Sequence, residues 1–75
     1  MTVEEIIDRD FEKPEDKVVL IPYIELVRNN NWGVGNEQLL KSLLILSEGS
    51  IKKFKSFFPI TDPRDIIVDA QKKIN

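Results

Sequence analysis

Three acidic side chains near the start of the chain have the alternating spacing of a calcium-binding loop. Asp8, Asp10 and Glu12 stand at the first, third and fifth positions of such a loop. The sixth position requires glycine for a sharp turn and the twelfth requires a bidentate glutamate, but Lys13 and Val19 stand there. We therefore predict a solvated acidic surface in this segment and no metal site.

A second motif that could bind a ligand is Gly33-Val34-Gly35, which precedes a predicted helix. Backbone N–H groups at a helix start can bind phosphate, but the other parts of a phosphate-binding loop, a preceding strand, a third glycine and a lysine, are missing. The chain also has no histidine and no cysteine. Their absence removes the usual general base, the usual zinc ligand and thiolate chemistry, so we expect no enzyme, no catalytic residue and no cofactor.

Lysines form a third candidate group. Lys52, Lys53 and Lys55 lie on the exposed face of a short predicted helix, within a segment at 36–58 that has a helix-turn-helix layout. Together with Lys41 they are the candidates for contacts with DNA phosphates. Lysines alone do not read base edges, and the net charge of the chain is −2. DNA binding is therefore the alternative function.

Large apolar side chains at loop or helix ends are the remaining candidates. Aromatic residues dominate the energetics of protein interfaces, and we predict Trp32, Tyr23, Phe58 and Ile60 as anchors for a protein partner. The opposing interpretation is that these four side chains close the core. A homodimer is a variant of the same hypothesis, because a small domain can bury more surface against a copy of itself. The sequence thus favours a non-catalytic protein-binding module of the regulatory or inhibitory kind.

Size and composition predict one small domain at 1–75 outside the membrane. The first residues are acidic, and the longest apolar run, 18–24, is far shorter than a bilayer span. A basic amphipathic anchor at 51–58 is also short for membrane binding. We therefore expect a cytoplasmic protein without a membrane partner. Ten isoleucines and eight lysines beside one alanine indicate an AT-rich coding sequence, and hence a phage or a low-GC bacterium.

Helices must position these residues. Thr2 and Glu5 have the spacing of a capping box, which predicts a first helix at 3–12 that stops before Pro14. The segment 37–46 carries six leucine or isoleucine side chains that cover more than one face. This pattern predicts a central helix that neighbours contact on several sides.

The segment 18–27 is ambiguous, and residues 13–21 can be helix, strand or coil. Its β-branched residues favour a strand, whereas Pro22 is tolerated in a helix chiefly in the first turn. We favour a helix that begins at residue 21 or 22. Two alternatives stay open: a short strand at 17–21, or a longer helix that begins near Pro14 and is kinked at Pro22.

Two further helices complete the predicted fold. Ser50 is placed to cap a short helix that stops at Pro59, and Asp62 is placed to cap a last helix that begins at Pro63. The expected fold class is all-α: a compact orthogonal bundle of four to five short helices around the leucine-rich helix at 37–46.

Overall fold

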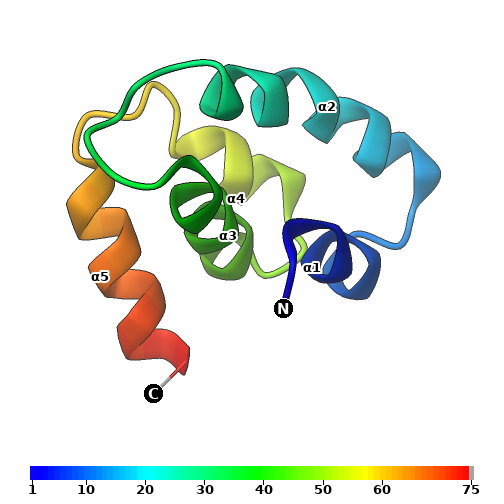
Figure 1. Ribbon diagram of the computed structural model, residues 1–75. Helices are drawn as coiled ribbons and strands as arrows, with labels where there is room; N and C mark the ends of the chain where they lie inside the picture. The colour runs from blue at the N-terminus through cyan, green and yellow to red at the C-terminus, as the bar shows by residue number, and fades with distance from the viewer. Residues whose placement is uncertain (75) are drawn as a thin grey trace.

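A computed structural model describes residues 1–74, and within that range the chain forms five helices and no strand. They are α1 (Val3–Asp10), α2 (Pro14–Arg28), α3 (Asn36–Ser47), α4 (Ile51–Ser56) and α5 (Pro63–Ile74). The prediction of a small all-α bundle is confirmed. Figure 1 shows α2 along the top of the bundle, with the start of α1 and the end of α5 on the opposite side.

Helix α3 is the centre of the bundle. It packs against α1, α2, α4 and α5, and Leu39, Leu40, Leu43 and Leu44 are all fully buried. Because these leucines point in several directions around the helix, they contact different neighbours. Burying each one contributes on the order of 1.5 to 3 kcal/mol before the entropy of folding is counted. The predicted central helix at 37–46 is confirmed.

The starts of α1, α4 and α5 carry the side-chain caps that the sequence indicated, whereas α2 and α3 begin without one. The Thr2 hydroxyl accepts a 3.2 Å hydrogen bond from the Glu5 backbone, and the Glu5 carboxylate accepts one of 2.9 Å from the Thr2 backbone. The Ser50 hydroxyl likewise accepts from the Lys53 backbone at the start of α4. Helix α1 ends at Asp10, two residues earlier than predicted, because the backbone of Phe11 leaves the helix as its ring enters the core.

The ambiguous segment forms one helix of 15 residues that continues through Pro22. Neither the predicted start at residue 21 or 22 nor the strand alternative is correct, and the longer helix from Pro14 is the observed form. A proline cannot donate to the carbonyl one turn earlier, here that of Val18. Pro22 and Val18 are both exposed, so water can reach that carbonyl and satisfy it. The exposed position explains why the helix tolerates the proline.

The turn between α3 and α4 lies against the end of α1. Glu48 and Gly49 both have positive φ, of 51° and 80°. A Cβ atom on Gly49 would lie 2.6 Å from the carbonyl oxygen of Asp10, so only glycine fits at this position. The Glu48 carboxylate pairs with Lys53 and with Lys73 of α5. The turn therefore joins α1, α4 and α5 at one end of α3.

Candidate protein-binding surface

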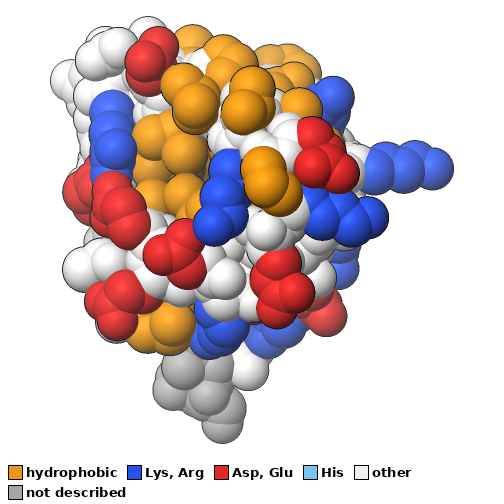
Figure 2. Space-filling model, turned by 90° about the vertical axis from the view of Figure 1, so that its right-hand side faces the viewer, with side chains coloured by type: hydrophobic (Ala, Val, Ile, Leu, Met, Phe, Trp, Pro, Cys, Tyr) orange, Lys and Arg blue, Asp and Glu red, His pale blue; other side chains and the backbone are white. Residues whose placement is uncertain are grey.

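Exposed apolar side chains concentrate on one side of α2. Of the five large apolar residues exposed in the described part of the chain, α2 contributes Val18, Ile21 and Leu26, with 64%, 51% and 45% of their surface exposed. These residues and the exposed Pro22 recur at intervals of three and four, so they share one helix face. We call Val18, Ile21, Pro22 and Leu26 the outer face of α2. In Figure 2 hydrophobic side chains gather along the top of the molecule, where α2 lies in Figure 1.

The opposite side of α2 belongs to the core. Leu20 and Val27 are fully buried, Tyr23 and Ile24 are half-buried, and the helix packs against α3 and α4. Helix α2 is thus apolar on two sides but covered on one. An uncovered apolar stripe of this kind is typical of a surface that binds another molecule, whereas apolar residues scattered singly need no explanation.

Ion pairs hold both ends of α2. Near its start, the Lys17 ammonium lies 2.9 Å from the Asp8 carboxylate of α1. Near its end, Arg28 donates to both oxygens of Glu37 on α3, at 2.8 and 2.6 Å, and also lies 3.3 Å from Glu4 on α1. The hydrogen bonds from Arg28 lower the pKa of Glu37, and those to Glu37 and Glu4 raise the pKa of Arg28. These ion pairs are largely exposed and each contributes little, so the burial of Leu20 and Val27 decides which side of α2 faces solvent, and the ion pairs reinforce that orientation.

Two of the predicted protein-binding anchors, Tyr23 and Phe58, meet in one cluster. The Tyr23 ring lies edge-on to Phe54 of α4, with ring centroids 5.6 Å apart, and 4.8 Å from the Phe58 ring. Phe54 is fully buried, and Tyr23 and Phe58 are half-buried. Aromatic pairs in such geometries contribute about 0.5 to 1.5 kcal/mol beyond their burial. This aromatic cluster attaches the inner side of α2 to α4.

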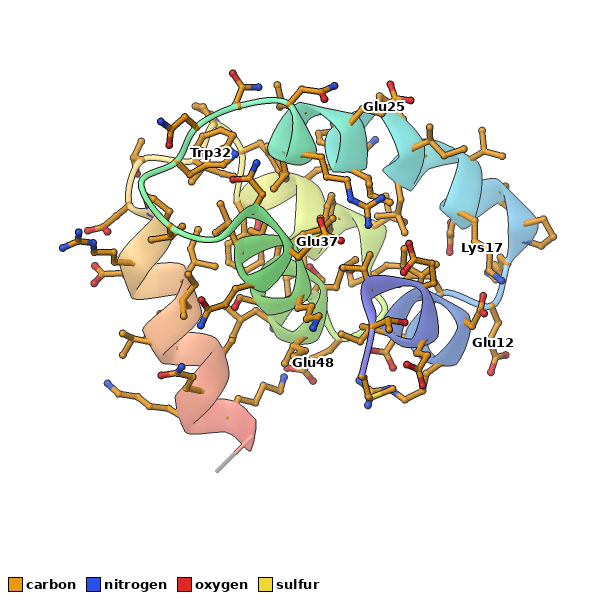
Figure 3. All side chains as sticks on the ribbon, in the orientation of Figure 1. Glu12, Lys17, Glu25, Trp32, Glu37 and Glu48 are labelled. Carbon is orange, nitrogen blue, oxygen red and sulfur yellow. The ribbon has the colours of Figure 1, made fainter. Side chains whose placement is uncertain are left out.

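The other two predicted anchors lie in separate connections. The Trp32 indole donates a 2.8 Å hydrogen bond to the carbonyl of Val27, and Figure 3 shows its ring on the inner side of the loop that joins α2 to α3. Ile60 lies between α4 and α5. Both side chains are half-buried and pack against the core. All four predicted anchors are therefore less exposed than Val18, Ile21, Pro22 and Leu26 on the outer face of α2, which we did not predict as anchors.

The candidate DNA-binding lysines are divided between two elements. Lys52, Lys53 and Lys55 are exposed on α4, which has only six residues, and Lys53 pairs with Glu48. Lys41 is half-buried on α3 and lines a cavity of about 390 Å³ with residues of α1 and of α3 itself. The structure therefore keeps together the three lysines of α4 and places Lys41 on a separate surface.

Residues 1–74 contain no group of three acidic side chains arranged to hold a metal ion, and no helix among them is long and apolar enough to cross a bilayer. Asp10, from the calcium-like spacing, is hydrogen-bonded to the guanidinium of Arg9 at 2.8 and 3.0 Å. The pKa of this carboxyl is lowered by Arg9.

A scan against protein-family models found no match to the chain, and searches of curated proteins and of solved structures found none either.

Proposed function

We propose that this chain is a non-catalytic protein-binding module, of the regulatory or inhibitory kind, that binds its partner through the outer face of α2. The observation that carries the proposal is the exposure of Val18, Ile21 and Leu26 on the solvent side of a helix whose other side is in the core. Covering the exposed part of each side chain contributes on the order of 1 kcal/mol to binding. The buried contacts of Leu20 and Val27 on the inner side keep this face oriented before a partner arrives, which lowers the entropic cost of binding.

The aromatic cluster and Trp32 contact α2 on the side opposite its outer face and near its end. Tyr23 packs on Phe54 and Phe58 on the inner side of α2, and the Trp32 indole binds the carbonyl of Val27 near its end. In this proposal three of the predicted anchors, Tyr23, Phe58 and Trp32, hold α2 in place, and the aliphatic residues on its outer face make the central contacts with the partner.

DNA binding is the alternative function, and it draws on fewer observations. A helix of six residues is about 9 Å long, which offers few side chains to a major groove. Lys53 already pairs with Glu48, so Lys52 and Lys55 are the cations of α4 that carry no ion pair within residues 1–74. This arrangement favours the protein partner.

The proposal is tested by selecting ligands without knowing the partner. A library of displayed helical peptides is enriched on the full chain, and the enriched peptides are measured against Ile21→Glu and Leu26→Glu. The control is Val68→Glu on α5, since Val68 and Leu26 are equally exposed, at 45%. Circular dichroism verifies that each variant is folded, as expected for surface substitutions that change stability by about 0.5 kcal/mol or less.

We expect the enriched peptides to lose at least about tenfold in affinity for both α2 variants and to bind Val68→Glu as they bind the parent chain. Peptides that bind all three variants equally well would refute the outer face of α2 as the binding surface. Enrichment of ligands that are lost with Val68→Glu alone would place the surface on α5 instead.

A further inference from the structure

Two carboxylates lie on the same side of α2 as its outer face. Glu15 is three residues before Val18, and Glu25 is seven residues after it, so both fall on that side at helical spacing. Both side chains are exposed, and neither forms an ion pair within residues 1–74. Figure 3 shows Glu25 pointing away from the bundle. An apolar stripe therefore has one free carboxylate towards each end.

The nearest cations do not neutralise these carboxylates. Lys17 pairs with Asp8, and Arg28 pairs with Glu37 and Glu4, on the sides of α2 that face α1 and α3. At the start of the helix the one remaining cation, Lys13, is outnumbered by the acids at 12, 15 and 16. The solvent side of α2 therefore has a negative potential around an apolar centre.

A second copy of this chain is a poor occupant for such a surface. Antiparallel pairing of two outer faces would bring four carboxylates, Glu15 and Glu25 of each copy, to the interface, with Lys13 of each copy as the remaining cation near the helix starts. This excess of like charge at an interface costs binding energy. An anionic lipid surface would be repelled for the same reason. A positively charged partner meets no such cost.

We infer that the partner is a protein that presents an amphipathic helix with two lysines or arginines flanking an apolar stripe. Ten residues of α-helix separate Glu15 from Glu25, so the two cations should lie about 15 Å apart. The apolar residues between them cover Val18, Ile21 and Leu26, and the cations pair with the two carboxylates. This inference rests on the proposed function and specifies the partner's chemistry.

The test uses two synthetic peptides and the intact chain. Each peptide is an amphipathic helix of about 18 residues with a leucine stripe, and two residues about ten positions apart at the edges of that stripe are both lysine or both glutamate. Fluorescence polarisation measures their affinities at about 0.05 M and about 0.5 M NaCl. The charge-reversal variant is Glu25→Lys, and its control is Asp69→Lys on the exposed side of α5, which changes the net charge equally.

We expect the lysine peptide to bind the parent chain at least about tenfold more tightly than the glutamate peptide, with the preference reduced at high salt. Glu25→Lys should weaken the lysine peptide and strengthen the glutamate peptide by about three- to fivefold each, the effect of one exposed ion pair, while Asp69→Lys leaves both within about twofold. Reduced affinity of the lysine peptide for Ile21→Glu would verify that it binds at the outer face.

Three results would overturn the inference, and they separate it from the proposed function. If both peptides bind equally and lose affinity with Ile21→Glu, the outer face is a binding surface without this charge preference. If neither peptide binds and light scattering shows a dimer that Ile21→Glu dissociates, a second copy is the occupant. If neither peptide binds, the chain is monomeric and only uncharged vesicles retain it, the surface binds lipid and both proposals fail.

Discussion

Helices α2 and α3 have similar apolar sequences and opposite surroundings. Both carry aliphatic side chains on more than one side, but α3 is covered by four neighbours whereas α2 is covered on its inner side only. The difference does not lie in residue type, since leucine, isoleucine or valine occupies both the buried and the exposed positions. The tertiary arrangement therefore decides which side of a two-sided apolar helix is buried, and in α2 it leaves one side exposed.

The two helices also differ in how they are held. The fully buried leucines of α3 give it an attachment that salt and acid affect little. The attachment of α2 combines the buried Leu20 and Val27 and the aromatic cluster with ion pairs at Lys17 and Arg28, and these ion pairs are partly exposed and respond to both salt and acid. The following predictions test this difference, beginning with the largest effect.

Truncation of α3 should destabilise the protein far more than the same kind of truncation on the outer face of α2. We expect Leu43→Ala to lower the free energy of unfolding by about 2 to 5 kcal/mol, because it leaves a cavity in the core. Val18→Ala should change it by about 0.5 kcal/mol or less, since Val18 is exposed. Urea unfolding followed by circular dichroism measures both, and a similar loss for the two variants would contradict the contrast between the helices.

The connections that follow the two helices should differ in the same direction. Gly49, after α3, has positive φ and no space for a Cβ atom, whereas Gly33, after α2, has positive φ and nothing within 4 Å of that atom. We expect Gly49→Ala to cost about 2 to 4 kcal/mol and Gly33→Ala about 1 kcal/mol, the cost of the left-handed backbone alone. Thermal unfolding compares the two variants directly, and equal costs would show that the contact with Asp10 relaxes freely.

Acid should loosen α2 before α3. Because Arg28 lowers the pKa of Glu37 in the folded protein, their interaction stabilises the fold above the ordinary carboxyl pKa, about 4.3, and the stabilisation is lost as the pH falls through the lowered value. Trp32 fluorescence reports on the end of α2 through the indole hydrogen bond to Val27. We expect this signal to change at a higher pH than the helicity measured by circular dichroism.

The control for the acid experiment is Glu37→Gln, which removes the charge that Arg28 binds while keeping the side chain nearly the same shape. It should weaken the pH dependence of the Trp32 signal and leave the helicity transition almost unmoved, because α3 is held mainly by buried leucines. Coincident fluorescence and circular-dichroism transitions in the parent chain would mean that α2 and α3 unfold as one unit.

Local signals in the sequence predicted the starts of α1, α4 and α5 and the central helix, but not the start of α2. Thr2, Glu5 and Ser50 act within a few residues of their position, so their capping roles do not depend on the rest of the fold. The leucines of α3 cover so much of the helix that any arrangement of neighbours would bury them. These predictions rest on interactions that the sequence specifies locally.

The start of α2 and the identity of its exposed side could not be predicted from such local signals. Pro22 is compatible with a helix interior here because it faces solvent, but both sides of the helix are apolar and periodicity does not indicate which side is exposed. The aromatic residues Tyr23, Trp32 and Phe58 were nominated by type, and the structure packs all three against the core. One signal for the outer face was available in the sequence. The aliphatic residues between 18 and 26 are more numerous than a single helix face can bury.

The beginning of α1 and the far end of α5 both lie on the side of the bundle away from α2 (Figure 1). A carrier protein fused to either end would therefore lie on the side of the bundle away from α2, as would a sensor surface to which either end is tethered. Val18, Ile21 and Leu26 would remain exposed to solution. Amino-terminal and carboxy-terminal fusions should consequently be interchangeable in binding assays. Such a layout leaves the outer face of α2 unobstructed when another domain is attached at either end.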